Sequence, residues 1–180
     1  MTNQPVSGND LARFAGLNTF MRLPAAETAA GLDVSILGIP MDIGTSWRSG
    51  TRFGPKQVRT ESAMIRPYNI QTGAAPFDSL NMADIADLAI NTFSLADSLR
   101  IIEEAYADVL VHPTIPVAIG GDHSITLPIL RAIAKKHGPV ALVHVDAHAD
   151  VNDEMFGERE THGTVFRRAY EENLIKPELT

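Results

Sequence analysis

The sequence predicts an α/β fold, a three-layer αβα arrangement in which helices cover both faces of a mostly parallel sheet. Three observations support this prediction. Short apolar segments alternate with segments of helical periodicity along the chain. The apolar segments are continuous runs, which is typical of strands buried on both faces. Loops rich in glycine, aspartate and histidine follow two of these segments, and in such sheets functional groups gather at the carboxyl ends of the strands.

Four apolar runs are predicted strands, and the first of them ends at Pro40. A run of four to eight apolar residues bounded by turn residues indicates a buried strand. A loop rich in glycine, serine and threonine, residues 41–54, follows the first run, and Gly120-Gly121 follows the third. The four predicted strands are residues 34–39, 80–85, 114–119 and 140–145.

Helices are predicted between and after these strands. The first, residues 55–66, has Pro55 in its first turn, where proline is favoured. The second begins after Ser94, with Asp97 in a capping-box pattern, and ends before Pro113. Its apolar residues recur at spacings of four, three, four and three, which marks one helix face; they are Leu95, Leu99, Ile102, Tyr106 and Val109. The remaining helices are residues 126–137, which end in basic residues before a glycine, and about 163–173.

Composition narrows the class of protein. The 180 residues carry a formal net charge of −7, and this balance argues against a nucleic-acid partner and against a polybasic membrane anchor. The chain contains no cysteine, which excludes disulfides and thiolate metal sites. No apolar stretch approaches the roughly 20 residues of a membrane helix. We therefore expect a cytoplasmic protein with a flexible tail at residues 1–12 and part of a single domain at 13–180.

The loop after the fourth predicted strand carries a metal-binding pattern. Asp146, His148 and Asp150 alternate with two alanines, and extended chain places alternate side chains on one side. Two carboxylates and an imidazole crowded together would repel unless a cation lay among them. The alternative is that Asp146 and Asp150 cap helices and His148 is a solvated loop residue. Three such residues in alternation at a strand end favour metal binding.

The loop after the third predicted strand adds a fourth candidate ligand. His123 follows Gly120-Gly121, where glycine permits a tight turn. Asp122 is expected to hold this loop or the imidazole from outside the ligand shell. A sulfur-free set of imidazole and carboxylate ligands suits Mn(II), Fe(II), Zn(II), Co(II) or Ni(II). A carboxylate such as Asp146 could also bridge two metals, as in two-metal hydrolases.

These motifs resemble the ureohydrolase family of arginases and agmatinases. The matching stretches are Gly-Gly-Asp-His-Ser at 120–124, Val-His-Val-Asp-Ala-His-Ala-Asp at 143–150 and Thr-His-Gly-Thr-Val-Phe-Arg-Arg at 161–168. The stretches beginning at Arg13, Phe20, Gly38 and Arg52 resemble the agmatinase and guanidino-acid hydrolase branch. The resemblance extends from about residue 13 to the last residue.

The resemblance implies an arginase-like αβα fold and two Mn(II) ions. A hydroxide bridging them would hydrolyse a guanidino compound to urea and an amine, with agmatine as the expected substrate and putrescine as its product. It places His123 and Asp150 on one metal and His148 on the other, with Asp146 as the bridge. It assigns substrate contact to Asn152 and proton transfer to His162. For His162 the alternative is a surface loop histidine.

Several alternatives stay open. The substrate could instead be a guanidino acid, 4-guanidinobutanoate or 3-guanidinopropanoate. Arg48 or Arg52 would then bind its carboxylate by bidentate pairing. The acidic loop 152–160 favours the cationic tail of agmatine instead. A different amidohydrolysis on the same fold, such as deacetylation, is a further possibility. Ala149 and Val165 depart from the residues usual in the family, although neither removes a ligand.

Length is the larger departure from the family. The family carries a further Asp-x-Asp pair and a glutamate in its second half, and this sequence contains no match to them. We therefore expect an N-terminal half with an exposed edge strand, which is completed by a longer chain or by a partner. Alternatively the chain is a non-catalytic binding or regulatory subunit. The family resemblance also implies a homo-oligomer, a trimer or a hexamer.

Overall fold

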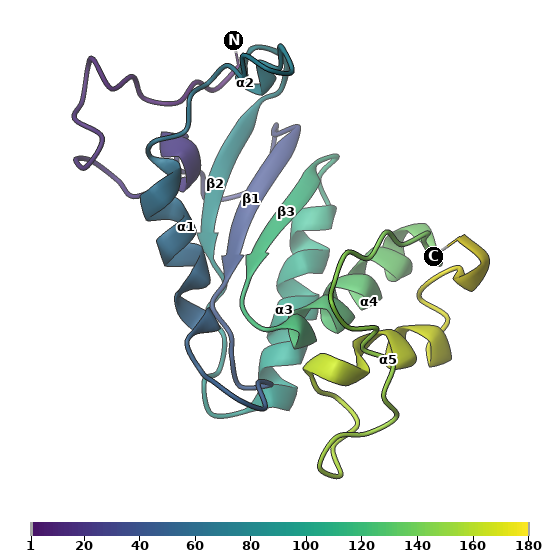
Figure 1. The fold of residues 1–180 in the computed structure, drawn as a ribbon. Coiled ribbons are helices and arrows are strands. Elements are labelled where there is room, and N and C mark those ends of the chain that lie inside the picture. Colours follow the sequence, from purple (N-terminus) through teal and green to yellow (C-terminus); the bar gives the residue numbers. More distant parts are fainter. Residues whose placement is uncertain (1, 180) are drawn as a thin grey trace.

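The computed structural model describes residues 2–179 and contains a three-stranded parallel sheet in the order β2-β1-β3. The central strand β1 (Val34–Ile39) lies between β2 (Met82–Asp87) and β3 (Ile115–Gly120). Val34 is level with Met82 on one side and with Ile115 on the other. All three strands therefore end at the same edge of the sheet (Figure 1).

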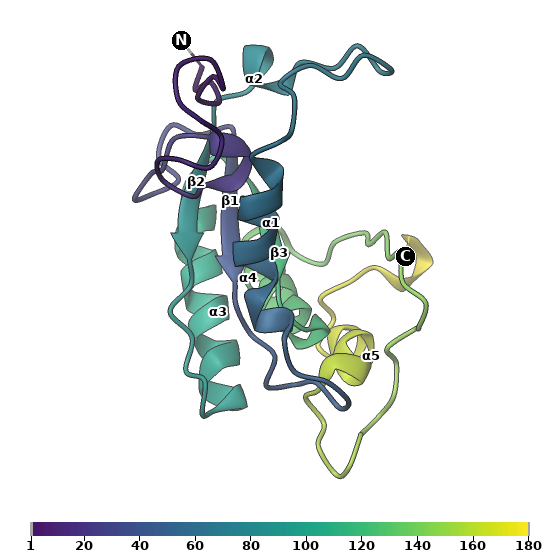
Figure 2. The same ribbon diagram turned by 60° about the vertical axis from the view of Figure 1, so that its left-hand side comes forward.

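Helices cover both faces of this sheet and make three layers. Their bounds are α1 Gly54–Ser62, α2 Pro76–Ser79, α3 Leu95–Leu110, α4 Thr126–His137 and α5 Val165–Glu171. Figures 1 and 2 show α1 on one face and α3 with α4 on the other. The partial αβα architecture predicted from the sequence is thus present.

The side chains of β1 alternate between the two faces, and all six residues are buried. Leu37 and Ile39 pack in apolar clusters with residues of α3 and α4. Val34 and Ile36 pack on the opposite side with Phe20 and the strand β2. Burial on both faces explains why this strand reads as one continuous apolar run.

The helix α3 matches its prediction closely. The Ser94 hydroxyl accepts a hydrogen bond of 3.2 Å from the backbone N–H of Asp97 and so caps the helix. Leu99, Ile102 and Tyr106, from the predicted apolar face, are buried. The helix α4 has the predicted bounds and ends at Gly138, whose φ is 75°. Local periodicity and capping therefore define both helices.

Other boundaries differ from the prediction. The helix α1 ends at Ser62 and does not reach residue 66. The strand β2 lies two residues later than predicted. The predicted helix 163–173 is a short 3-10 turn, His162–Thr164, followed by α5. Each difference affects an end of an element and leaves its type unchanged.

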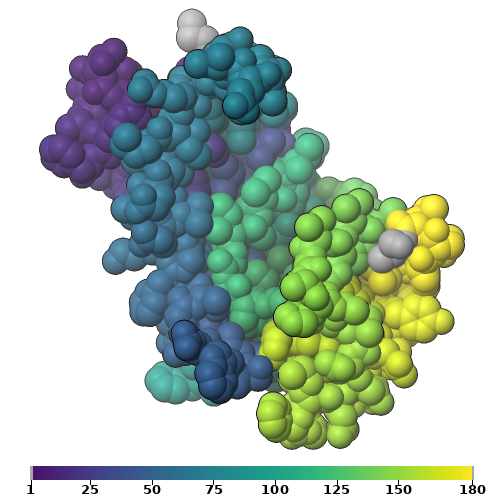
Figure 3. Space-filling model, viewed as in Figure 1, coloured from purple at the N-terminus to yellow at the C-terminus, as the bar shows by residue number. Residues whose placement is uncertain are grey.

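The predicted fourth strand, residues 140–145, is wrong. Val140 makes one bridge with Ile175, a residue that follows α5. Val143 and Val145 are 91% and 93% exposed, and Figure 3 shows this segment, in light green, on the molecular surface. A strand needs a hydrogen-bonding neighbour, and within residues 2–179 residues 141–145 have none. The outer edge of β3 is therefore open in the part of the chain that is described.

The N-terminal residues contact the opposite end of the sheet. The Asn3 side chain donates a hydrogen bond of 3.0 Å to the carbonyl of Met82, and the Val6 N–H donates to the carbonyl of Arg22.

None of the helices among residues 2–179 combines the length and the apolar character that crossing a bilayer requires.

Candidate metal centre

Loops from the carboxyl ends of β1 and β3 meet at one edge of the sheet. A short 3-10 turn, His123–Ile125, follows β3. Between them lies Gly121, at a φ of 97°, where a Cβ would stand 2.5 Å from the carbonyl oxygen of Ile39. Only glycine fits this close approach, and the tight turn directs His123 away from the end of β3.

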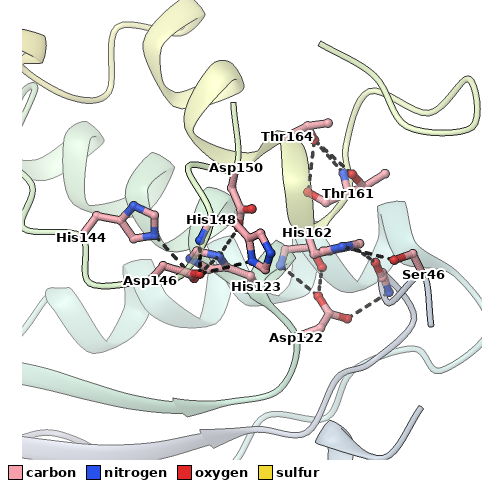
Figure 4. Close-up of polar contacts among 12 residues, drawn as sticks. Ser46, Asp122, His123, His144, Asp146, His148, Asp150, Thr161, His162 and Thr164 are labelled. Atoms are coloured by element: carbon pink, nitrogen blue, oxygen red, sulfur yellow. Dashed lines mark hydrogen bonds and ion pairs between the residues drawn. The ribbon is translucent and has the colours of Figure 1, made fainter. Parts of the chain in front are cut away.

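His123 lies between two carboxylates (Figure 4). Its Nδ1 is 2.5 Å from an oxygen of Asp150 and 3.6 Å from an oxygen of Asp146. The three side chains come from two loops, yet their polar atoms converge on one point. The structure therefore brings together three of the four side chains that the sequence predicts as ligands.

His148, the fourth, lies at the rim. Its side chain is 82% exposed, and its Nδ1 is 3.7 Å from Asp146. Its backbone N–H instead donates a hydrogen bond of 2.9 Å to Asp146, and this bond is the main reason that the pKa of the Asp146 carboxyl lies below its usual value. The predicted alternation assumed extended chain, whereas residues 141–150 are irregular and Asp150 has a φ of 50°.

His144 joins this group, although the sequence-based ligand set omits it. Its Nε2 lies 3.6 Å from a carboxylate oxygen of Asp146 and is buried without a hydrogen-bond partner among residues 2–179. Ligand atoms of His123, His144 and Asp146 all lie within 4.8 Å of one another. The ring of His144 rests on Phe166, with 4.3 Å between centroids. His144 lies two residues before Asp146 and continues the alternation of Asp146, His148 and Asp150. This spacing could have identified it as a candidate ligand.

The donor set fits a divalent transition metal. Two imidazoles and two carboxylates converge without sulfur, the mixture that suits ions such as Mn(II) and Zn(II). Within the described part of the chain, the buried Nε2 of His144 has no hydrogen bond to offset its desolvation. A cation among these groups would balance the carboxylates and use that lone pair, so the residues present fit a metal ion.

Asp122 does not contact an imidazole among the described residues. Its carboxylate is buried and accepts hydrogen bonds of 2.9 Å from the backbone N–H groups of Ser124 and Gly44. Asp122 therefore joins the loop after β3 to the loop after β1.

His162 reaches the same β1 loop from the turn before α5. Its Nδ1 lies 2.7 Å from the carbonyl oxygen of Gly44, and its Nε2 lies 3.4 Å from the hydroxyl of Ser46. The turn is fixed by a capping box between Thr161 and Thr164. His162 is thus ordered by specific contacts.

A cavity of about 540 Å³ is lined by His162 and by two of the predicted metal ligands, His148 and Asp150. Its walls include Ser46, His148, Asp150, Asn152 and His162. Asn152 is held by a hydrogen bond of 3.1 Å from its backbone N–H to the carbonyl of Gly163. The structure therefore places the predicted substrate-contacting residue and the predicted proton carrier around one space.

The far part of the β1 loop is tied by Asp42. Its buried carboxylate accepts hydrogen bonds of 2.6 Å from Arg52 Nε and from the backbone N–H of Gly50. The Arg52 guanidinium holds the pKa of Asp42 below its usual value. Arg52 therefore stabilises the conformation of this loop through Asp42.

Comparison with known proteins agrees with this arrangement. Residues 32–180 match the profile of the Arginase family. The chain is 63% identical over 176 residues to a guanidinobutyrase of Pseudomonas aeruginosa, covering 96% of this chain and 55% of the relative. It is 52% identical over 173 residues to a mitochondrial agmatinase of Gallus gallus, covering 96% and 51%. The chain spans about half the length of the curated relatives that it matches.

Solved structures share the fold. Proclavaminate amidino hydrolase from Streptomyces clavuligerus superposes with a TM-score of 0.88 at 41% identity, covering 93% of this chain and 56% of that one. Trypanosoma cruzi formiminoglutamase with Mn²⁺ superposes with a TM-score of 0.75 at 26% identity, covering 87% and 54%. The family match runs from the residues before β1 to the end of the chain and takes in every element of the candidate metal centre. The chain therefore belongs to the arginase family.

Proposed function

We propose that the protein hydrolyses a guanidino acid, such as 4-guanidinobutanoate, to urea and an amino acid in a metal-dependent reaction. One observation carries the proposal: His123, Asp146 and Asp150 converge beside a cavity that His162 faces. The 63% identity to a guanidinobutyrase points to this substrate class. The substrate first expected, agmatine, becomes the second candidate, supported by the 52% identity to an agmatinase.

The metal is proposed to be Mn(II), two ions in a complete site, as the Mn²⁺ in the related formiminoglutamase suggests. The residues that would hold the metal are His123, His144, Asp146 and Asp150, with His148 joining from the rim. Bound divalent ions of this kind lower the pKa of water so that a strong nucleophile exists at neutral pH. A guanidinium carbon is deactivated by resonance and needs such a nucleophile.

The side chains around the cavity would bind substrate and move a proton. His162 lines the cavity beside Ser46, and an imidazole there can donate a proton to the departing amine nitrogen. Asn152 lines the same cavity, and its amide can hydrogen bond to the substrate.

Ion pairs within the fold weaken the argument for an ammonium tail. Two of the four acidic residues in the loop 152–160 are paired within the fold: Asp153 lies 2.6 Å from Arg168, and Glu160 lies 2.7 Å from Arg131. Their attraction for a cation is thereby reduced. Arg48 pairs with no carboxylate in the region 2–179 and stacks 5.9 Å from the Trp47 ring. It is the candidate partner for the substrate carboxylate.

A non-catalytic binding subunit is the candidate function of another class. A subunit of this class would bind Mn(II) without turnover. The cytoplasmic location, the oligomeric state and the division into a tail at 1–12 and a domain at 13–180 stay predictions.

Urea release tests the proposal. The protein, expressed from its complete reading frame and loaded with Mn(II), is offered 4-guanidinobutanoate, agmatine and arginine separately. We expect the highest kcat/KM with 4-guanidinobutanoate, and no urea from a His123→Ala variant. A higher kcat/KM with agmatine would establish the second candidate. Tight Mn(II) binding with no urea from any substrate would favour the binding subunit.

A further inference from the structure

We infer that Asp122 is a positioning residue for His162. Through the backbone of Gly44 it fixes the imidazole so that Nδ1 carries a proton and Nε2 faces the cavity. This inference rests on the proposed function, in which His162 moves a proton. The contacts that support it join three segments that are far apart in the sequence.

The first step is the carboxylate of Asp122, which is 5% exposed. One oxygen accepts from the N–H of Ser124 at 2.9 Å and also contacts the Ser124 hydroxyl. The other oxygen accepts from the N–H of Gly44 at 2.9 Å. An ionised carboxylate accepts hydrogen bonds and donates none. Asp122 can therefore accept from backbone N–H groups of both loops at once. Figure 4 shows Asp122 below the imidazoles, between the two loops.

The second step is Gly44, which stands very close to its neighbours. A Cβ there would lie 2.6 Å from the Ser124 hydroxyl oxygen and 3.0 Å from Asp122. A side chain at this position would push the loop away from Asp122. The N–H of Gly44 donates to Asp122, while its carbonyl accepts from His162. Asp122 therefore sets where that carbonyl oxygen lies.

The third step is the tautomer of His162. A carbonyl oxygen is only an acceptor, so the Nδ1 that lies 2.7 Å from it must carry a proton. In the neutral imidazole the lone pair is then on Nε2. Ser46 lies 3.4 Å from Nε2 and can donate its hydroxyl hydrogen there. The nitrogen that gains and loses a proton is therefore the one on the cavity side.

The chain offers matched variants for separating this role from general stability. Asp122→Asn keeps the size of the side chain but places an amide NH2 group, a donor, opposite the backbone N–H of either Ser124 or Gly44. Gly44→Ala leaves Asp122 intact and displaces the loop. Ser124→Ala removes only the hydroxyl contact and keeps the bond to Gly44. The first two variants should therefore affect His162, and the third should not.

The primary readout is the protonation of each His162 ring nitrogen. The full chain is labelled with ¹⁵N-histidine and loaded with diamagnetic Zn(II), and ring nitrogen shifts are assigned with a His162→Gln variant. We expect the parent protein and Ser124→Ala to show a protonated Nδ1 and an unprotonated Nε2. Asp122→Asn and Gly44→Ala should show a mixture of tautomers. Bound metal per chain and thermal melting are measured on every variant, so that loss of the metal site or of the fold is detected separately.

Turnover of the Mn(II)-loaded protein supplies the second readout. Asp122→Asn should lower kcat on the order of 10²-fold, the effect of a misplaced catalytic group, while KM changes little. An unchanged tautomer and an unchanged kcat in both Asp122→Asn and Gly44→Ala would overturn the inference, as would an equal change in Ser124→Ala. If the parent protein releases no urea, the proposed function fails, whereas the tautomer result still decides the role of Asp122.

Discussion

The Nδ1 of His123 lies 2.5 Å from a carboxylate oxygen of Asp150, although 27 positions separate the two residues. One residue follows β3 and the other follows an irregular segment, so this contact joins the two loops of the metal centre. Removing the imidazole should therefore remove metal binding. We expect His123→Ala to weaken Mn(II) binding by more than the roughly 10–100-fold that loss of an outer partner costs, measured by isothermal titration calorimetry. His137→Ala, at the exposed end of α4, is the control.

His144 should contribute to the same affinity. Its buried Nε2 lies 3.6 Å from Asp146 and has no hydrogen-bond partner among the residues that the structure describes. His144→Phe keeps an aromatic ring against Phe166 but removes the lone pair. We expect Mn(II) affinity to fall roughly 10–100-fold with little change in thermal stability. Unchanged affinity would show that His144 is a packing residue.

Arg48 should decide between the two substrate classes. Arg48→Gln removes the charge that is proposed to meet a carboxylate tail, so KM for 4-guanidinobutanoate should rise by about 10-fold, equivalent to ~1.4 kcal/mol. KM for agmatine should not rise, because its tail is cationic. Steady-state urea release with both substrates measures this. Arg100→Gln, on the solvent side of α3, is the charge-matched control, and a parallel rise for both substrates would contradict the assignment.

The buried ion pair between Arg59 and Asp84 should matter for stability. The Nε of Arg59 lies 2.8 Å from Asp84, and the two side chains are 9% and 2% exposed. Asp84→Ala removes two of the hydrogen bonds to the buried guanidinium and leaves Asp87 as its remaining carboxylate partner. The cost should therefore approach the lower end of the roughly 3–5 kcal/mol of a broken buried pair, measured by urea denaturation. The exposed pair of Arg100 with Glu104 is the comparison, and Glu104→Ala should change the midpoint little.

Asp42 should add a pH-dependent contribution to stability. Its folded-state pKa lies below the unfolded value, chiefly because of the hydrogen bond from Arg52. The stabilisation is then fully present above the unfolded pKa, about 3.9, and is lost as the pH falls through the lower folded value. Asp42→Asn should therefore lower the unfolding midpoint at pH 7 and narrow the difference between pH 7 and pH 3. Urea denaturation at both pH values measures this.

Features that depend on local sequence were predictable. The capping serine and apolar face of α3, the bounds of α4 and the continuous run of β1 all reflect interactions within a few residues. His123 was predictable as a candidate ligand because it follows a parallel strand whose carboxyl end lies at the edge shared by the strands. The Asp146 loop was predictable from its closely spaced aspartates and histidines, although the strand expected before it is absent. The 63%-identical guanidinobutyrase favours the guanidino-acid alternative over agmatine.

Features that depend on distant partners were not predictable. Residues 141–145 have strand composition but no strand to pair with among the described residues. The alternation that placed His148 beside Asp146 is lost with the predicted strand. The contact of His162 with Gly44 joins a side chain to a backbone carbonyl 118 positions away. Backbone acceptors leave no mark in composition or periodicity, so only the folded chain reveals this contact.

The open edge of β3 limits how another strand can pair with this sheet. Ile115 donates its N–H to Asp33, toward β1, so by alternation Pro116, Ala118 and Gly120 face outward. Pro116 has no N–H, and proline on an edge strand discourages unwanted pairing. Only the carboxyl half of the edge can donate to an added strand. Any segment that extends this sheet, from the same polypeptide or from another, can therefore accept N–H hydrogen bonds from this edge only next to the His123 loop, whereas Pro116 offers it a carbonyl alone. Part of the pairing that completes the sheet thus lies beside the metal centre.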